Sequence, residues 1–478
     1  MKFDFLINGR LSHETDKTYP VYCKADQSVI TEVPDASEAD IDAAVAAARA
    51  ALPVWRRVKP VDRCKMVARM ARLMRERVHE VTEHFGKEGG LPRNALKGGI
   101  SFHSDLWLFY AGIGDKQYGS VLEHEGEYLN YFIREPLGVI ACMLAWNTPL
   151  GSFSQKVPPA LLGGNTVVVR VPDEAPLAAL WMGTLAREAG FPDGVLNIVA
   201  GLGGESGAYL VRHPEVDGVS FTGSVVVGRK IAEACAPIFK RSVLELGGKS
   251  PFIICSDADL EKAAAHAVQA AFAYQGQGCS AVSRVLIEEA VHDEVLARMV
   301  EMVKSYRPAL PDTPVTDSPQ IGPMFNKRQM ERTLEFVALA KREARLLAGG
   351  YRLVDPPFDK GYYLQPAICS LEDTDSELFM EEIFGPLLTV VSFKDEAHAI
   401  ALANKCNFAL SGSVWSKDFG KARGMAEAIR FGTVWTNNHL CFSHHSPWGG
   451  YKNTGWDREF GIDAIESFTE VKSIWLHP

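Results

Sequence analysis

From about residue 138 onward, the sequence alternates short apolar runs with stretches of helical periodicity. The runs include GVIACML, NTVVVR, VLNIV, GVSFTG, SVLEL and PFIIC, and helical stretches such as APLAALWMGTLAREAG lie between them. Buried strands separated by helices predict βαβ units and a parallel sheet. A second alternation begins near residue 251 and includes RVLIEE, HDEVLARMVEMV and LLTVVSF. Two α/β domains therefore fit the chain better than one.

The part of the chain before residue 138 has helical patterning. SEADIDAAVAAARAALPVW begins with Ser37 and Asp40 in a capping-box arrangement, and its alanine-rich continuation favours a helix. Residues 61–85 place apolar side chains at three-and-four spacing, which predicts a further helical region. The terminal ESFTEVKSIWL has the character of a strand, which needs a partner in its own chain or in another subunit.

Charge and composition exclude several classes of protein. The 50 basic and 59 acidic residues give a net charge of −9 without a like-charge block, which argues against nucleic-acid binding. No apolar run approaches the roughly 18 residues of a membrane helix, and the amino terminus lacks the apolar core of a signal peptide. The nine widely spaced cysteines predict a reduced, cytoplasmic protein. Because no CxxC pair or HExxH cluster occurs, we expect no metal site.

Three residues have side chains suited to chemistry on a carbonyl group. Cys279, in YQGQGCSAVSR, is either a nucleophile or a compact buried apolar residue. Glu245, in LELGGKSP, is either an ion-paired structural residue or a general base with a raised pKa. Asn147, after the run GVIACML, is either a turn residue before Pro149 or a donor to a developing oxyanion. Each residue taken alone leaves both interpretations open.

Two glycine-containing loops are candidates for phosphate binding. GLGGESG, at residues 201–207, has Ser206 where the dinucleotide fingerprint needs its third glycine, so we interpret it as an ordinary strand-to-helix turn. In FTGSVVVGRK, Gly223 allows close backbone approach and Ser224 is placed to cap a helix whose amino terminus attracts an anion. Many helices begin with Gly-Ser, so this loop alone is a weak signal.

Taken together, these motifs resemble the aldehyde dehydrogenase superfamily, in the non-acylating, NAD(P)-dependent form. The matching segments, in the order in which the family has them, are EPLGVI, WNTPL, Lys156, GGNTVVVR, GFPDGVLNIV, FTGSVVVG, LELGGKSP, GQGCSAVSR, EEIFGPLL, SPWGGYKNTG and FTEVK. The resemblance implies an α/β fold with two Rossmann-like open-sheet domains and a small β oligomerisation extension. The domains expected from it are residues 1–117 and 137–246 for cofactor binding, 247–447 for catalysis, and 118–136 and 448–478 for oligomerisation or bridging.

The resemblance also implies a role for each catalytic residue. Cys279 attacks the aldehyde to give a thiohemiacetal, whose oxyanion Asn147 and the Cys279 backbone N–H hold while a hydride leaves. Glu245 then activates the water that hydrolyses the thioester. Lys156 is expected in the catalytic set and also beside the nicotinamide ribose. The other residues expected at the cofactor are Trp146, Arg170, Asp173, Gly223, Ser224, Gly228, Leu246, Glu382 and Phe384.

The segment after NTVVV departs from the family pattern and bears on the choice of cofactor. It reads RVPD, with Arg170 where the family usually has lysine and Asp173 where it has the glutamate that grips the adenosine ribose. An aspartate still accepts both ribose hydroxyls, which favours NAD. Arg170 paired with a 2′-phosphate would favour NADP instead. We expect NAD, with NADP as the alternative.

The substrate residues expected from the resemblance combine aromatic and small side chains. Phe442 and Trp448 supply the aromatic part. The small or polar members are Thr148, Gly151, Ser152, Gln155 and Gly278. We expect a benzaldehyde-type or medium-length apolar aldehyde, and betaine-type, semialdehyde and aliphatic aldehydes are the alternatives. His444 and His445 are candidates for contacting a ring hydroxyl, although exposed loop histidines are the simpler interpretation.

Three functions of other kinds fit the sequence less well. A coenzyme A-dependent acylating enzyme needs no water-activating carboxylate, whereas Glu245 is present. A cysteine hydrolase needs a histidine base, and the motifs around Cys279 and Asn147 hold none. A catalytically silent structural relative would be expected to lose one of these three residues. The resemblance further implies a homodimer or homotetramer, in which the last strand, about 468–475, adds to a neighbour's sheet beside a hairpin near 118–136.

Overall fold

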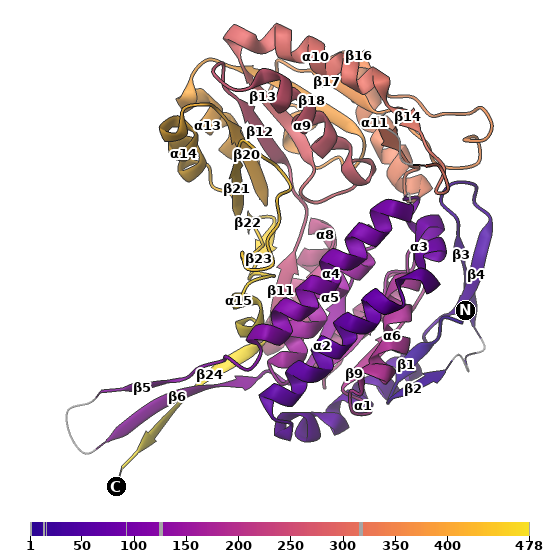
Figure 1. Ribbon diagram of the computed structural model, residues 1–478, viewed down its shortest axis with the longest axis vertical. Helices are drawn as coiled ribbons and strands as arrows, with labels where there is room; N and C mark the ends of the chain where they lie inside the picture. The colour runs from indigo at the N-terminus through magenta and orange to yellow at the C-terminus, as the bar shows by residue number, and fades with distance from the viewer. Residues whose placement is uncertain are drawn as a thin grey trace.

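The computed structural model describes residues 2–12, 15, 17–91, 93–123, 128–314 and 319–477. Figure 1 shows two lobes, each built on one large sheet with helices on its faces, and an arm of strands that projects from the lower lobe. The predicted mixed α/β fold with two open sheets and a small β extension is confirmed.

The sheet of the lower lobe has eight strands in the order β2-β1-β9-β8-β7-β10-β11-β23. Its five central strands, β9 to β11 in that order, are parallel, and the strands at both edges are antiparallel. Their bounds in sheet order are Arg10–Ser12, Phe5–Ile7, Leu196–Val199, Thr166–Arg170, Val139–Met143, Gly218–Thr222, Arg241–Glu245 and Gly455–Trp456. Strands β7 and β8 are buried along their whole length, which explains why they read as continuous apolar runs.

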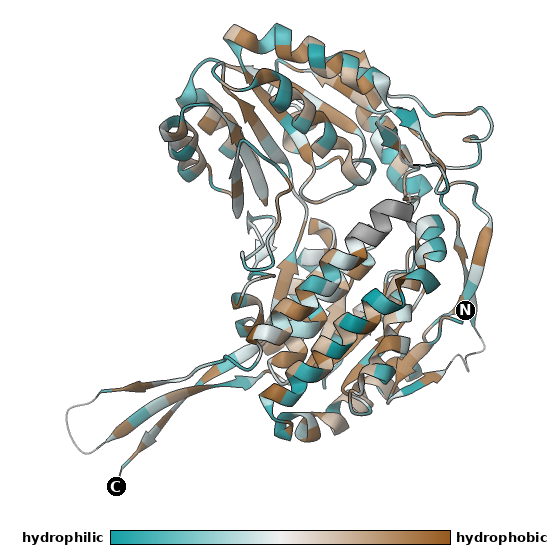
Figure 2. Ribbon diagram, viewed as in Figure 1, coloured by the Kyte–Doolittle hydropathy of each residue, from teal (hydrophilic) through white to brown (hydrophobic). Residues whose placement is uncertain are grey.

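Helices cover both faces of this sheet. One face carries α5 and α6, with α2, α3 and α4 in a further layer outside them, and the other carries α1, α7 and α8. Their bounds are Pro149–Leu162 (α5), Leu177–Ala189 (α6), Pro60–Glu76 (α2), Thr82–Gly89 (α3), Arg93–Ile113 (α4), Glu38–Arg57 (α1), Glu205–Arg212 (α7) and Val225–Cys235 (α8). Figure 2 shows hydrophilic residues along the outward side of α2, as expected for an outer layer.

The sheet of the upper lobe has seven strands in the order β16-β17-β18-β13-β12-β20-β21, and only the edge strand β16 is antiparallel. Their bounds in sheet order are Arg345–Ala348, Ala367–Ser370, Leu387–Phe393, Val282–Glu288, Ser250–Ile254, Ser411–Trp415 and Thr433–Thr436. The helices on its two faces form separate apolar clusters. They are α9 (Leu260–Phe272) and α10 (His292–Ser305) on one face, and α11 (Lys327–Glu343), α13 (Glu396–Asn404) and α14 (Phe419–Ala428) on the other.

The arm consists of β5 (Ser120–Leu122), β6 (Leu129–Pro136) and β24 (Thr469–Leu476). The last strand pairs antiparallel with β6 of its own chain, in a register that runs from Thr469 opposite Pro136 to Leu476 opposite Leu129. The strand thus lies beside the hairpin as expected, as the edge strand of a three-stranded sheet, and its addition to a neighbour's sheet stays a prediction. Its eight residues pair with β6 on one side, and no described strand pairs with its other side.

The amino-terminal region is more varied than its helical pattern predicts. Ser37 caps α1 in a capping box with Asp40, as predicted. Residues 61–85 form most of α2, the 3-10 turn η1 (Val78–Glu80) and the start of α3, in agreement with the predicted helical region. Before α1 lie four strands that the sequence did not predict: β1 and β2 at the sheet edge, and the ribbon β3 (Thr18–Tyr22) and β4 (Val29–Pro34).

The remaining elements are short. They are η2 (Ala236–Ile238), η3 (Ala273–Gly276), η4 (Glu289–Val291), α12 (Glu377–Met380), α15 (Asp463–Glu466), β14 (Arg307–Pro308), β15 (Gln320–Ile321), β19 (Phe408–Ala409) and β22 (Tyr451–Lys452). The chain passes from the lower sheet to the upper one between Glu245 and Ser250, the link in which the sequence places its main domain boundary. Strand β23 returns from the predicted bridging segment to the lower sheet.

Candidate active site

Cys279 lies in the loop between η3 and β13, at the junction of the two lobes. Tyr274, Gln275 and Gly276 have φ angles of 50°, 58° and 70°, so three successive residues adopt left-handed backbone just before the loop. A Cβ atom at Gly276 would lie 2.5 Å from the carbonyl oxygen of Gly385, which excludes a larger residue there. This turn fixes the course of the backbone that carries the half-buried cysteine.

The surroundings of the thiol oppose its ionisation. Burial raises the pKa of Cys279 to about 12, and the charges of Glu245, Glu382 and Glu459 act in the same direction. Three carboxyl groups from distant parts of the sequence therefore lie near one cysteine. The thiol holds its proton at neutral pH in this structure, so a nucleophilic step needs a group that takes that proton.

Glu245 ends β11, and its side chain is buried. Neither carboxylate oxygen has a hydrogen-bond partner among the described residues. Burial raises the pKa of Glu245 well above its ordinary value, with a further contribution from Glu459, and Lys156 opposes the shift. A buried carboxyl without an ion-pair partner in the described chain fits a proton acceptor better than it fits a structural ion pair.

Asn147 is brought to the same junction by β7, whose end it follows. Its side chain is buried, and Nδ2 donates a hydrogen bond to the carbonyl oxygen of Gln277 at 2.7 Å. This bond holds the amide at Gln277, which lies two residues before Cys279 in the chain. Because the NH₂ group carries two hydrogens, one donor remains for another acceptor.

Lys156 is fully buried on α5 and forms an ion pair with Glu459, with 2.5 Å between Nζ and Oε1. Its ammonium also donates to Ser220 Oγ at 3.1 Å. Glu459 was missed from the sequence, because its loop carries no signal that a carboxylate there is buried. The ion pair lies close enough to Glu245 for both charges to act on the pKa of that carboxyl.

Two of the residues expected at the cofactor, Trp146 and Phe384, lie together. The rings of Trp146 and Phe384 have centroids 5.4 Å apart at 82°, and Phe384 has a φ of 56°. Glu382 Oε1 accepts a hydrogen bond from the Gly248 N–H at 2.8 Å, and burial raises its pKa to about 7. Gln329, which sequence reasoning missed, donates to the Phe384 carbonyl at 2.7 Å and so positions this loop.

The amino terminus of α8 has features suited to binding a nucleotide. Ser224 caps the helix by accepting from the Val227 N–H at 3.3 Å, as predicted. A Cβ atom at Gly228 would lie 2.6 Å from Leu246 Cδ2, so only glycine lets the helix pack this closely. Val226 is 63% exposed and Leu202, at the neighbouring α7, is 59% exposed. Exposed apolar side chains at a helix amino terminus fit an adenine ring with its phosphates.

The side chain of Arg170 hydrogen-bonds to the neighbouring loop. Its buried guanidinium donates to the carbonyl oxygen of Gly201 at 2.7 Å and to that of Gly203. Asp173 Oδ2 accepts from the Gly203 N–H at 3.0 Å, so both residues hold residues 201–203 in place. That loop is a strand-to-helix turn between β9 and α7, as predicted.

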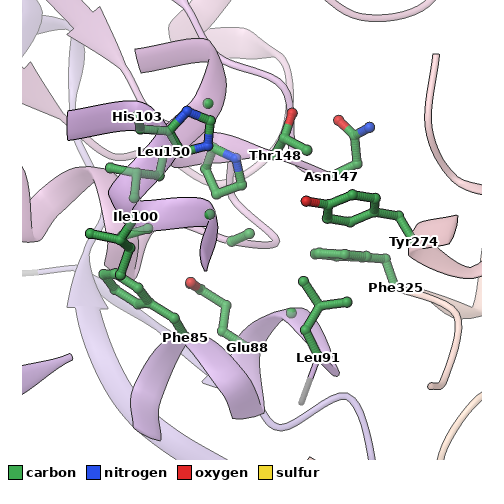
Figure 3. Close-up of a pocket in the computed structure, with 16 residues that line it drawn as sticks. Phe85, Glu88, Leu91, Ile100, His103, Asn147, Thr148, Leu150, Tyr274 and Phe325 are labelled. Carbon is green, nitrogen blue, oxygen red and sulfur yellow. The ribbon is translucent and has the colours of Figure 1, made fainter. Parts of the chain in front are cut away.

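The residues expected at the substrate fall into separate groups. Phe442 and Trp448 pack edge to face, with centroids 5.0 Å apart at 66°. Thr148 and Gly151 line a cavity beside Asn147 (Figure 3). Ser152 is buried and its hydroxyl donates to the Thr148 carbonyl at 3.2 Å, whereas Gln155 and Gly278 are half-buried.

The two loop histidines pack on α4. The His444 ring lies 4.4 Å from that of Phe102, and the His445 ring lies 4.6 Å from that of Phe109. His445 is exposed, and His444 is half-buried. Among the described residues, no three His, Cys, Asp or Glu side chains gather in a way that could hold a metal ion. No described helix is both long and apolar enough to cross a membrane.

Residues 11–474 match the sequence model of the aldehyde dehydrogenase family. The chain belongs to this family. It is 39% identical to aldehyde dehydrogenase 1A1 of Gallus gallus over 99% of this chain and 92% of the relative. It superimposes with a TM-score of 0.97 on a putative aldehyde dehydrogenase of Burkholderia cenocepacia, at 35% identity over 100% of this chain and 98% of that one. An aldehyde dehydrogenase of Bacillus cereus gives 0.96 at 35% identity, over 100% of this chain and 97% of that one. This aldehyde dehydrogenase is thus an oxidoreductase that converts an aldehyde to an acid.

Proposed function

We propose that this enzyme oxidises a neutral aromatic or medium-length apolar aldehyde, with NAD as the hydride acceptor. The observation that carries the proposal is the meeting of Cys279, Asn147 and Glu245 at the junction of the two lobes. The Cys279 thiol loses its proton to solvent water, Sγ attacks the carbonyl carbon, and the free N–H of Asn147 stabilises the oxyanion that forms. NAD, when bound, accepts the hydride that leaves the tetrahedral carbon.

Glu245 carries the second half of the reaction in this proposal. It takes a proton from water, and the resulting hydroxide attacks the thioester and releases the acid and the thiol. Its raised pKa makes it a better proton acceptor than an ordinary carboxylate. The charge of Glu459 raises the pKa of that carboxyl further, and the charge of Lys156 opposes the shift.

The choice of NAD rests on the loop that follows β8. Arg170 donates to two backbone carbonyls, so a 2′-phosphate would have to displace bonds that hold residues 201–203. The Asp173 carboxylate lies at the same loop and would repel that phosphate. The structure of the Bacillus cereus relative is an NAD⁺ complex, which supports the same choice. NADP remains the alternative for the test below.

Membership of the family does not identify the aldehyde that this enzyme oxidises. Relatives at 37% and 30% identity are named retinal dehydrogenase 2, from Homo sapiens, and betaine aldehyde dehydrogenase, from Staphylococcus aureus. The aromatic pair Phe442 and Trp448, joined by Trp435 at 5.7 Å from Phe442, supports a flat or apolar substrate. A betaine-type, semialdehyde or aliphatic substrate is the second candidate.

The assembly and location belong to the same proposal. The arm exposes apolar side chains such as Val121 and Val471, which supports a homodimer or homotetramer. A relative in Elephantulus edwardii at 38% identity is named as cytosolic, which supports a cytoplasmic enzyme. We also propose that the catalytic and cofactor domains meet at the link between Glu245 and Ser250.

The test is cofactor reduction over a panel of benzaldehydes, aliphatic aldehydes, semialdehydes and betaine aldehyde, each with NAD and with NADP. We expect the highest kcat/KM with benzaldehydes and NAD, and no reduction in Cys279→Ala. A strong preference for betaine or short aliphatic aldehydes would overturn the substrate, and a preference for NADP would overturn the cofactor. Turnover that survives in Cys279→Ala would remove the cysteine from the mechanism.

A further inference from the structure

A tight turn carries Cys279 at the junction of the two lobes. The Ala281 N–H donates to the Gly278 carbonyl at 3.1 Å, so Cys279 and Ser280 are the two central residues of a β-turn. The Ser280 N–H donates a hydrogen bond to the cysteine sulfur, which lowers the pKa of the thiol, whereas burial raises it. The backbone of Ser280 therefore favours the thiolate, which is the nucleophilic form of the cysteine.

The imidazole of His439 holds the carbonyl of that same serine. Its Nε2 lies 2.9 Å from the Ser280 carbonyl oxygen, and its Nδ1 is hydrogen-bonded to Ser413 Oγ. A carbonyl oxygen can only accept, so Nε2 carries the hydrogen and donates it to Ser280. Burial lowers the pKa of His439 to about 4, with a smaller contribution from His266, so the ring is neutral at physiological pH and Nδ1 accepts from the Ser413 hydroxyl.

The upper sheet fixes the position of this histidine. Ser413 belongs to β20, and His439 follows β21, the neighbouring strand. Asn437 bonds twice to Ser416, accepting from its N–H at 3.1 Å and donating to its carbonyl at 2.9 Å, which ties the loop to the end of β20. The His439 ring lies 4.7 Å from that of Trp435, and only 5% of the residue is exposed. The donor to Ser280 is therefore locked in place by its surroundings.

We infer that His439 is a positioning residue for the nucleophile: its Nε2–H holds the Ser280 carbonyl and so fixes the turn that directs the Ser280 N–H to Cys279 Sγ. The inference rests on the proposed function, in which Cys279 is the nucleophile, and adds a residue that acts through the backbone rather than on the substrate. Without this bond the peptide groups of the turn are free to rotate, and the N–H meets the sulfur less often.

Three titratable side chains face the thiol from other elements. Glu245 comes from the end of β11, Glu382 from the loop after α12, and Glu459 from the loop after β23. All three raise the pKa of the thiol and so oppose the contribution of the turn. The variants of His439 below leave these carboxyl groups unchanged, so their comparison isolates the turn.

Three variants separate the hydrogen bond of His439 from its packing. The amide of His439→Asn lies at the level of Nδ1 and reaches Ser413 alone, whereas the longer side chain of His439→Gln carries a donor to the level of Nε2 and reaches Ser280. His439→Phe keeps the ring and removes the donor. If His439→Phe does not fold, the comparison of His439→Asn with His439→Gln decides alone.

The first test is alkylation of Cys279 by iodoacetamide between about pH 7 and pH 9, where the rate follows the thiolate fraction. Peptide mass spectrometry separates this thiol from the exposed Cys441. We expect rates lower by about threefold or more in His439→Asn and His439→Phe, which corresponds to a pKa higher by about half a unit, and a rate within about twofold of the wild type in His439→Gln. A wild-type rate in His439→Asn, or an equal loss in His439→Asn and His439→Gln, would overturn the inference.

Two controls distinguish ionisation of the thiol from access to it. His266→Phe should keep the wild-type rate, because His266 lies 5.1 Å from Trp415 in the same aromatic cluster but bonds to the Lys262 carbonyl rather than to the turn. The bulkier N-ethylmaleimide should react more slowly in His439→Asn by the same factor as iodoacetamide. A loss with the bulkier reagent alone would show blocked access and overturn the inference.

The second test follows the first turnover by stopped-flow absorbance of the reduced cofactor. In His439→Asn the rate at saturating benzaldehyde and NAD should fall by the factor found for alkylation, and the half-saturating benzaldehyde concentration should stay unchanged. A higher half-saturating concentration with an unchanged rate would show that His439 shapes the aldehyde site, which overturns the inference. Wild-type alkylation of His439→Asn in an enzyme that oxidises aldehydes refutes the positioning role alone. A wild type that oxidises no aldehyde refutes the proposed function and, with it, the catalytic purpose of the turn.

Discussion

The charge of Glu245 makes Cys279 harder to ionise. The carboxyl is the largest charge contribution to the raised pKa of the thiol, after burial. The thiol is therefore harder to ionise while the Glu245 carboxylate carries its charge. This coupling suits a mechanism in which the thiol gives up its proton early and the carboxyl accepts one later.

Replacing Glu245 by glutamine should lower the pKa of Cys279, because the variant removes a negative charge that opposes the thiolate. The rate of alkylation by iodoacetamide, followed against pH, should rise at a lower pH in Glu245→Gln than in the wild type. Glu381→Gln is the control, since this exposed glutamate does not act on the thiol. If the midpoint of the alkylation rate against pH moved to higher pH in Glu245→Gln, Glu245 would promote ionisation of the cysteine instead.

At the scale of single elements, β13 is held beside the active-site loop by Arg284. This fully buried guanidinium donates to three backbone carbonyls: those of Lys249 at 3.0 Å, Leu402 at 3.1 Å and Ala403 at 3.0 Å. It also lies over the Phe379 ring, 4.6 Å from its centroid. One side chain thus joins the strand after Cys279 to the segment that follows Glu245.

Arg284→Ala should lower the free energy of unfolding by about 3 kcal/mol or more, because three buried carbonyls lose a charged donor. Urea unfolding followed by far-UV circular dichroism measures the change. Arg298→Ala, which removes an exposed pair with Glu294, should change it by less than about 0.5 kcal/mol. Equal losses in the two variants would show that the buried network does not hold the strand.

At the same scale, the elements that could be predicted from sequence are those buried on both faces. Runs such as VVV in β8 are apolar because both sides of the strand are covered, and they were correctly assigned. The four strands before α1 are short and mostly edge or ribbon strands, so no apolar pattern marks them. Glu459 was missed because its burial against Lys156 is created only when α5 and the last loop come together.

At the scale of the whole molecule, the arm is the part that leaves apolar side chains exposed far from both lobes. Figure 1 shows it standing away from both lobes, and Figure 2 shows hydrophobic segments along it. Val121 is 70% exposed and Val471 is 58% exposed. The sequence placed the last strand beside the hairpin near residues 118–136, where the structure has it, and its addition to a neighbour's sheet stays a prediction.

The double variant Val121→Lys, Val471→Lys should shift the enzyme toward monomer, since charges on exposed apolar strand positions prevent their burial between subunits. Light scattering coupled to gel filtration measures the mass. Val54→Lys is the control, because Val54 is similarly exposed, at 54%, but lies on α1 away from the arm. A wild type that is already monomeric, or a double variant with unchanged mass, would contradict the proposed assembly.

The most direct measurement of the central claim is stopped-flow absorbance of the reduced cofactor in wild type and Glu245→Gln, with saturating benzaldehyde and NAD. If Cys279 forms the thioester and Glu245 hydrolyses it, the variant should give a burst of about one reduced cofactor per active site, followed by steady turnover slower by roughly 10²-fold or more. Mass spectrometry of the quenched variant should find the acyl group on Cys279. Steady turnover in Glu245→Gln equal to that of the wild type would contradict the account.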